Sequence, residues 1–140
     1  MKGMTTLSVP QISYETGSYE PGACNIGPAE IARRRRAGIA GIAAALMLAA
    51  GLFIVGAPPV TRIVVALPLS AGAVGLLQAR FRFCVRFALA GLRNFGPLGV
   101  AERVTDRAAH RADLQRAVLV MLAALAIGVA GAVVLALLPG

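Results

Sequence analysis

Long uncharged apolar stretches alternate with short charged blocks along the chain. Three stretches carry no Asp, Glu, Lys, Arg or His: residues 37–57, 63–79 and 117–138. About 20 apolar residues are enough for a helix to cross the hydrocarbon core of a membrane, and the middle stretch lies near the lower limit of length. The pattern therefore predicts an all-α integral membrane protein with three transmembrane helices.

Proline and glycine indicate where these helices begin and end. Pro28 suits the first turn of a helix, so we expect the first helix to begin there and to run through four consecutive arginines into the membrane. The pair Pro58-Pro59 ends this helix, and Pro68 is a candidate kink in the second span. Residues 28–140 would form the membrane domain. Residues 1–27 form a polar tail that we expect to be mobile.

Charged and amphipathic helices are predicted between the second and third spans, over residues 80–116. In a helix through residues 80–95, Arg82, Arg86 and Arg93 would lie within about 40° of one another, which is typical of an interfacial helix. A second span extended beyond the membrane is the alternative. Residues 101–116 predict a charged helix that leads into the third span. It would be stabilised by the pairs Arg103–Asp106, Asp106–His110 and Asp113–Arg116.

Basic residues predict the orientation of the chain. Five Lys and Arg precede the first span and eight lie in residues 80–116, whereas Arg62 alone lies in the turn between the first two spans. Because Lys and Arg concentrate on the cytoplasmic side, we expect a cytoplasmic N-terminus and an outside C-terminus. The richness in Ala, Gly and Arg is typical of GC-rich bacterial genomes, so the expected location is a bacterial cytoplasmic (inner) membrane.

The net charge of +8 raises the question of which partner the chain binds. Nearly all basic residues flank apolar spans, which favours anionic lipid headgroups as partners over nucleic acid. The candidate lipid- or partner-binding residues are Arg33, Arg34, Arg35, Arg36, Arg82, Arg86 and Arg93.

Cys24, Cys84 and His110 are weak candidates for holding a cofactor, and no particular cofactor is indicated. The close pairs typical of metal sites, CxxC and HxxxH, do not occur in the sequence, and no metal site or catalytic residue is predicted. The first two spans are joined by a tight turn and must be antiparallel neighbours. We therefore expect Cys24 and Cys84 to lie close together at the cytoplasmic surface as reduced thiols.

These features favour a non-catalytic small membrane subunit, or an accessory or assembly protein of a larger bacterial membrane complex or homo-oligomer. It would contact its partners through the basic cytoplasmic face and through the Ala- and Gly-rich spans, where small residues allow helices to approach closely. One alternative is a cofactor- or redox-linked membrane protein that uses Cys24 and Cys84. Another is an oligomeric transporter or channel.

Three segments carry a resemblance to other proteins: CNIGPAEIARRRR at residues 24–36, QARFRFCVRFALAGLRNFG at 78–96 and VTD at 104–106. They resemble a group of small bacterial polytopic membrane proteins to which no function is attached. The resemblance covers roughly residues 24–116. It implies a specific role for the cytoplasmic face without naming an activity.

Overall fold

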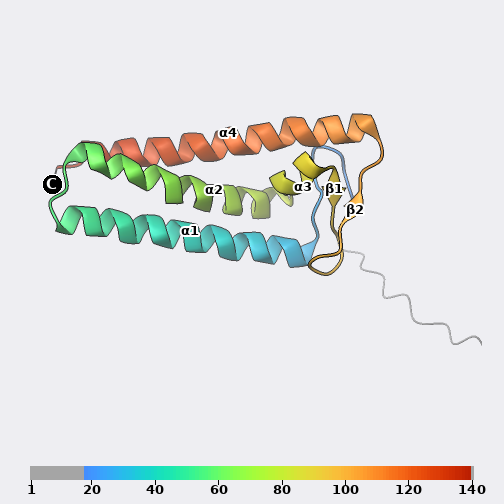
Figure 1. Cartoon of the computed structure of the whole chain (residues 1–140), viewed down its shortest axis with the longest axis horizontal. Helices are drawn as coiled ribbons and strands as arrows, with labels where there is room; N and C mark the ends of the chain where they lie inside the picture. The colour runs from blue at the N-terminus through green and yellow to red at the C-terminus, as the bar shows by residue number, and fades with distance from the viewer. Residues whose placement is uncertain (1–17, 140) are drawn as a thin grey trace, which may run out of the picture.

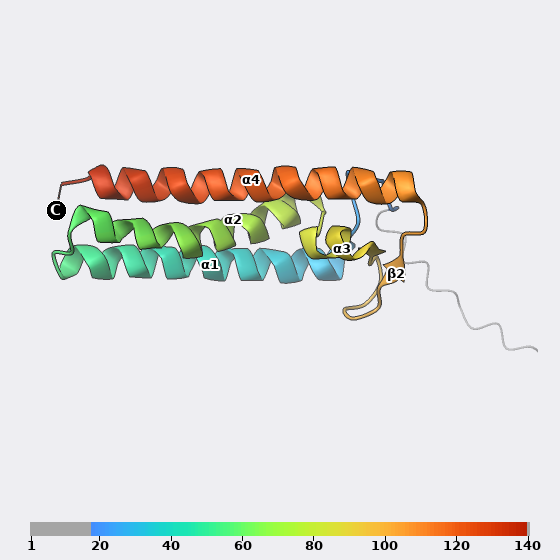
Figure 2. The ribbon, with the colours of Figure 1, turned by 45° about the horizontal axis from the view of Figure 1, so that its top comes forward.

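Three long helices lie side by side in the computed structural model, which describes residues 18–139 (Figures 1 and 2). The elements in chain order are α1 (Pro28–Ile54), the 3-10 helix η1 (Pro59–Val65), α2 (Ala66–Phe81), α3 (Val85–Ala90), β1 (Leu92–Arg93), β2 (Glu102–Arg103) and α4 (Arg107–Leu137). The small elements α3, β1 and β2 gather at one end of the bundle, and the C-terminus lies at the opposite end.

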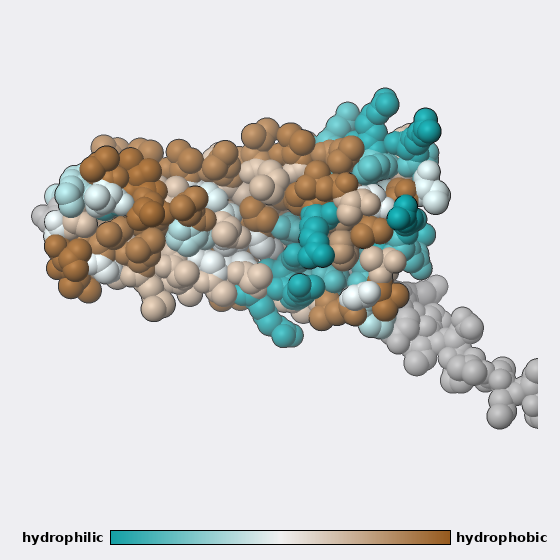
Figure 3. Space-filling model, in the orientation of Figure 1, coloured by the Kyte–Doolittle hydropathy of each residue, from teal (hydrophilic) through white to brown (hydrophobic). Residues whose placement is uncertain are grey.

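Three helical segments are long and apolar enough to cross a membrane: Pro28–Ile54, Pro59–Phe81 and Arg107–Leu137. This confirms the three predicted apolar helices, which is the architecture of a multi-pass membrane protein. In Figure 3, hydrophobic residues cover most of the length of the bundle, and hydrophilic residues gather at the end that carries α3 and the hairpin.

The bounds of α1 follow from its terminal residues, as the sequence predicts. Pro28 lies in the first turn, and the helix ends at Ile54, shortly before Gly56 with its φ of +65° and the Pro58-Pro59 pair. Pro68 is the third residue of α2, just after the 3-10 helix η1 passes directly into α2 at Ala66.

Glycines allow α1 and α2 to pack backbone against backbone. A Cβ atom added to Gly41 would lie 2.6 Å from the Cα of Gly72, and one added to Gly75 would lie 2.6 Å from the Cα of Gly38. Gly38 and Gly41 of α1 therefore lie directly against Gly75 and Gly72 of α2. Such close approach maximises van der Waals contact, which is the main attraction between helices in lipid.

One buried stripe of α4 packs against the rest of the bundle. Its members recur every three or four residues: Ala109, Asp113, Ala117, Val120, Ala124, Gly128 and Ala132. Gly128 faces the carbonyl oxygen of Ala66 and the side chain of Ser70 on α2. Most of the large apolar side chains on the other faces of α4 are exposed.

The predicted interfacial helix over residues 80–95 is wrong. The helix α2 stops at Phe81 because Arg82 adopts a left-handed conformation with φ of 53°, and α3 has only six residues before Gly91, whose φ is +66°. An antiparallel hairpin follows, in which Leu92 pairs with Arg103 and Arg93 with Glu102. The described chain is therefore mainly helical with one small sheet.

The charged helix predicted from residue 101 begins instead at Arg107. Asp106 forms the N-cap, and its carboxylate accepts hydrogen bonds from the backbone N–H groups of Ala108 at 3.1 Å and Ala109 at 3.3 Å. A capping aspartate satisfies N–H groups that have no partner within the helix. The helix then continues without a break into the third apolar span, as predicted.

Candidate functional site

Two buried asparagines hold the basic end of the bundle together. The side chain of Asn25 accepts a hydrogen bond from the backbone N–H of Cys84 at 2.6 Å and donates one to its carbonyl oxygen at 3.1 Å. The carbonyl oxygen of Asn25 accepts from the N–H of Asn94 at 2.9 Å, and the N–H of Gly27 donates to the carbonyl oxygen of Asn94 at 2.7 Å. We call Asn25, Asn94 and the backbone of residues 82–84 the asparagine latch.

The latch joins the start of α1 to the end of α2 and to the hairpin. The N–H groups of Asn25 and Ile26 both donate to the carbonyl oxygen of Arg82, at 3.1 and 3.4 Å. Residues 24–27 are buried, so this part of the expected mobile tail belongs to the fold. The expectation for residues 1–17 lies outside the described residues.

A buried acid lies next to the latch in the first turn of α1. Glu30 is 1% exposed, and its carboxylate lies 3.5 Å from Nη2 of Arg34 and 3.9 Å from Nη1 of Arg33. Nη2 of Arg34 also donates to Sγ of Cys84 at 3.0 Å. Because an isolated buried charge is costly, the two arginines and the positive end of the helix stabilise this carboxylate.

Asp113 forms a second buried contact between the N-terminal segment and α4. Its carboxylate accepts hydrogen bonds from the Tyr19 hydroxyl at 2.9 Å and from the Gly22 N–H at 2.7 Å, and the residue is completely buried. Burial raises the pKa of Tyr19 well above its usual range, and the hydrogen bond and negative charge of Asp113 add to the shift.

The three ion pairs predicted on the charged helix are wrong. Asp106 forms the N-cap, Asp113 binds Tyr19 and Gly22, and Nε2 of His110 lies 3.0 Å from the carbonyl oxygen of Ala88. The only ion pairs among residues 18–139 join Glu30 to Arg33 and Arg34, and Glu102 to Arg93. The tertiary contacts of these side chains replace their expected pairing along the helix.

Cys24 and Cys84 are free and buried, and their predicted proximity follows from the contact of Asn25 with Cys84. Since Asn25 contacts the backbone of Cys84, standard bond lengths place the two cysteine Cα atoms within about 12 Å. Burial raises the pKa of Cys24, although the charge of Arg82 opposes this effect. A protonated thiol is the less reactive form, which disfavours Cys24 as a redox nucleophile.

His110, the third cofactor candidate, does not join the two thiols in a metal site. It packs at the contact of α4 with the end of α3, near Gly91. Within residues 18–139 there is no group of three or more His, Cys, Asp and Glu side chains that could hold a metal ion.

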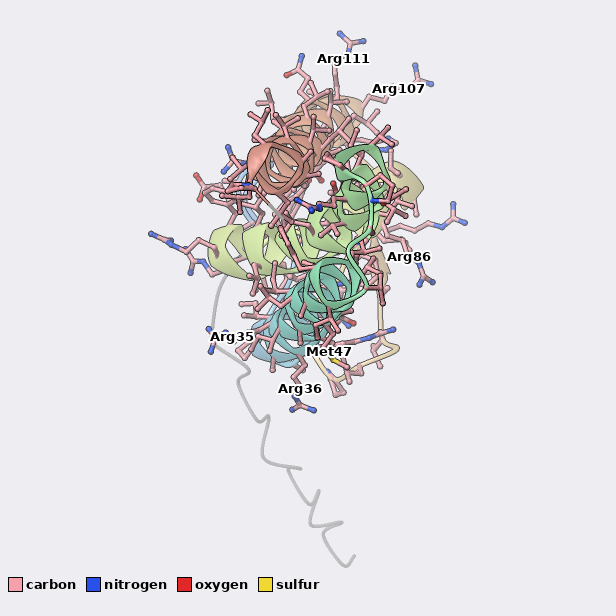
Figure 4. All side chains as sticks on the ribbon, turned by 90° about the vertical axis from the view of Figure 1, so that its left-hand side faces the viewer. Arg35, Arg36, Met47, Arg86, Arg107 and Arg111 are labelled. Carbon is pink, nitrogen blue, oxygen red and sulfur yellow. The ribbon has the colours of Figure 1, made fainter. Side chains whose placement is uncertain are left out.

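The seven candidate arginines lie on four parts of the fold and do not form one stripe. Arg33 to Arg36 lie in the first turns of α1, Arg82 ends α2, and Arg86 lies on α3. Arg93 lies in β1, where it pairs with Glu102 at 3.2 Å and stacks over the Tyr19 ring. Figure 4 shows Arg35, Arg36 and Arg86 projecting away from the bundle in different directions, together with Arg107 and Arg111 of α4. We call these five residues the arginine collar.

Arg62 fastens the opposite end of the bundle. The residue is 3% exposed, and its Nη1 donates to the carbonyl oxygens of Leu138 at 2.7 Å and Leu135 at 3.4 Å. Its guanidinium also lies 4.1 Å from the centre of the Phe53 ring. A cation at the C-terminal end of a helix satisfies free carbonyl groups, so Arg62 ties the end of α4 to η1 and α1.

The sequence did not predict the buried contacts of Asn25, Asn94 and Asp113, which stabilise much of this end, and Asp113 was expected to pair with Arg116 instead. For Asp113 a signal was present: it lies four residues from both Ala109 and Ala117, on the stripe that continues into the third span. For the asparagines no comparable signal exists, since their partners lie far away along the chain.

No protein-family model, curated protein or solved structure matches this chain. The geometry of the described residues therefore carries the functional argument.

Proposed function

We propose that the protein is a non-catalytic subunit, or an accessory or assembly protein, of a larger complex in a bacterial cytoplasmic membrane. The observation that carries this proposal is the arginine collar, whose side chains project outward from an end that buried polar contacts hold in place. A rigid end with free guanidinium groups suits contact with lipid phosphates and acidic protein surfaces.

The proposed orientation places the collar at the cytoplasmic surface. Every Lys and Arg except Arg62 belongs to the N-terminal segment, to residues 80–116 or to the first turns of α1 and α4. Arg62 is buried against the end of α4 and the Phe53 ring, so its charge is not exposed at the opposite end of the bundle. All Lys and Arg except Arg62 then lie on one side, which supports a cytoplasmic N-terminus and an outside C-terminus.

The outer faces of the spans support contact with partner helices. Ala123, Ala126 and Ala130 are exposed on α4 and lie three and four residues apart. Small residues at this spacing allow another helix to approach closely in lipid. The acidic surface of a partner would then meet the collar while its helices pack beside α4.

The proposal is tested by purifying the full chain from its own membrane in mild detergent and weighing the intact assembly by native mass spectrometry. We expect a complex with a defined partner, recovered less well as salt concentration rises. Arg35→Gln combined with Arg36→Gln should lower this recovery, and the matched Lys substitutions at both positions should largely preserve it, since they retain the charge. Recovery of the wild-type chain alone, or recovery of the Gln variant equal to wild type at every salt concentration, would contradict the proposal.

A second candidate, a redox-linked role for Cys84, is favoured by its contact with the Arg34 guanidinium. Alkylation of thiols in intact membranes before and after mild oxidation tests it. Oxidation that blocks Cys84 reversibly would support this role, and a thiol protected under both conditions would remove it.

A further inference from the structure

A groove opens on the side of the bundle where α2, α3 and α4 meet. Its volume is about 520 Å³, and its walls are formed chiefly by Val74, Val85, Leu89 and Met121. A second hollow of about 170 Å³ shares the last three of these residues and has an entirely apolar lining. Hollows of this size and lining are typical of sites for small apolar or amphiphilic ligands.

The groove also has polar lining residues. Arg34, Gln78 and Arg86 line it together with the apolar residues. Oε1 of Gln78 accepts a hydrogen bond from the Val85 N–H at 3.2 Å, which fixes this side chain in the wall. One site therefore combines cationic donors with an apolar surface.

The groove crosses the boundary between the basic end and the apolar belt. Met121 lies five residues beyond Arg116 on α4, and Val74 lies six residues before Arg80 on α2. At 1.5 Å per residue, Met121 and Val74 lie about 7–9 Å from Arg116 and Arg80 along their helices, towards the middle of the bundle. In a membrane, this places the cationic part at headgroup level and the apolar part beside the acyl chains.

The charge of the groove is positive. Arg86 is exposed and makes no ion pair within residues 18–139, and Figure 4 shows its side chain projecting outward. Arg34 also lines the groove, and its Nη2 contacts Glu30 and the Cys84 thiol. An occupant must therefore be negatively charged at one end and apolar at the other.

We propose that this groove binds one molecule of an anionic glycerophospholipid. The phosphate lies against Arg86 and Arg34, and an acyl chain follows the wall formed by Val74, Leu89 and Met121. The inference rests on the proposed membrane location and not on the partner complex. Failure of the lipid site and failure of the accessory role are therefore separate outcomes.

Native mass spectrometry of the delipidated protein tests this site by titration with phosphatidylglycerol, with phosphatidylcholine of the same acyl chains, and with water-soluble glycerol phosphate. We expect one phosphatidylglycerol to bind in preference to phosphatidylcholine, and glycerol phosphate to bind weakly because it lacks the acyl chain. Arg86→Gln should weaken phosphatidylglycerol binding about fivefold. The matched Arg103→Gln removes an exposed arginine of β2 that lies outside both the groove and the collar, and it should leave this binding unchanged.

A second variant tests the apolar wall. Leu89→Trp places a bulky ring in the groove at a residue that is 62% exposed, so it should reduce phosphatidylglycerol binding without disturbing the buried contacts. Equal binding of the two phospholipids, or equal losses in Arg86→Gln and Arg103→Gln, would overturn the proposal. A photo-reactive side chain at position 89 should crosslink to lipid in intact membranes. Crosslinking to a protein chain would assign the groove to a partner and would also overturn it.

Discussion

Asn25→Ala is expected to open the basic end of the bundle. The Asn25 side chain is completely buried and makes hydrogen bonds with both backbone groups of Cys84. Alanine removes both bonds without adding new ones, so the N–H and carbonyl of Cys84 lose these partners in a buried environment. The variant therefore measures what the asparagine latch contributes.

The expected magnitude follows from the two backbone groups that lose their partners. A buried donor or acceptor without a partner costs about 1–3 kcal/mol, so the pair costs about 2–6 kcal/mol. Since about 1.4 kcal/mol changes an equilibrium constant tenfold, the lower bound corresponds to an increase of about 30-fold in the population of the opened end.

Maleimide labelling of Cys84 reads out this opening directly. In a Cys24→Ser background Cys84 is the only thiol, and it is fully buried until the end opens. When closing is faster than labelling, the labelling rate follows the population of the open form. We expect Asn25→Ala to label at least about 30-fold faster than its parent in detergent.

Gln115→Ala is the matched control, because it removes an exposed side-chain amide from α4. Its labelling rate should stay within about twofold of the parent, as is usual for surface substitutions. If Asn25→Ala labelled Cys84 no faster than Gln115→Ala, the latch would not hold this end and the reasoning would be refuted.

Two further predictions concern helix packing and a buried ion–hydroxyl contact. Gly72→Ala should lower the free energy of unfolding by about 1–3 kcal/mol in denaturant titrations, because its Cβ would lie 2.7 Å from the backbone N of Ile42. The control Gly51→Ala should not lower the free energy of unfolding, because its Cβ would meet no atom within 4 Å. In a Tyr14→Phe background, phenolate absorbance should report a Tyr19 pKa above the ordinary value of about 10, and Asp113→Asn should lower it. Since the folded state holds this proton more tightly, the contact stabilises the fold below about pH 10, and its contribution falls as pH rises through the folded-state pKa. A Tyr19 that titrates normally would contradict this.

The three apolar helices were predictable because their signal is local. A run of residues without charge indicates a span, whatever its neighbours are, and the prolines at positions 28, 58 and 59 mark helix ends through their own covalent geometry. The sequence therefore predicted the start of α1 and the turn after it correctly. Which small residues of α1 and α2 contact each other became known only from the structure.

The segment between α2 and α4 was predicted incorrectly because its conformation depends on distant residues. The pattern of arginine and phenylalanine over residues 80–95 fits a helix by period alone. The structure breaks that helix at Arg82, whose carbonyl oxygen accepts from the N–H groups of Asn25 and Ile26, more than 50 residues earlier. A helical pattern contains no information about such a partner.

The buried polar residues were missed for the same reason. The partners of Asn25 lie 59 residues away, and Tyr19 and Asp113 are separated by 94 residues. Asp113 looks like a surface charge when its own helix is considered alone, since arginines lie on either side of it in sequence. Its position on the stripe of Ala109 and Ala117 was the one sequence signal that this carboxylate faces inward.

The arginine collar is proposed to lie at the cytoplasmic surface of a three-span protein. Reporter fusions test it most directly, with the reporter placed after Gly140 or in the exposed turn of residues 97–100, where an insertion should be tolerated. After Gly140, we expect activity only from a reporter that works outside the cytoplasm. In the turn of residues 97–100, we expect activity only from a reporter that works inside the cytoplasm. The reverse pattern, or both reporters active on the same side, would contradict the proposed orientation and with it the role assigned to the collar.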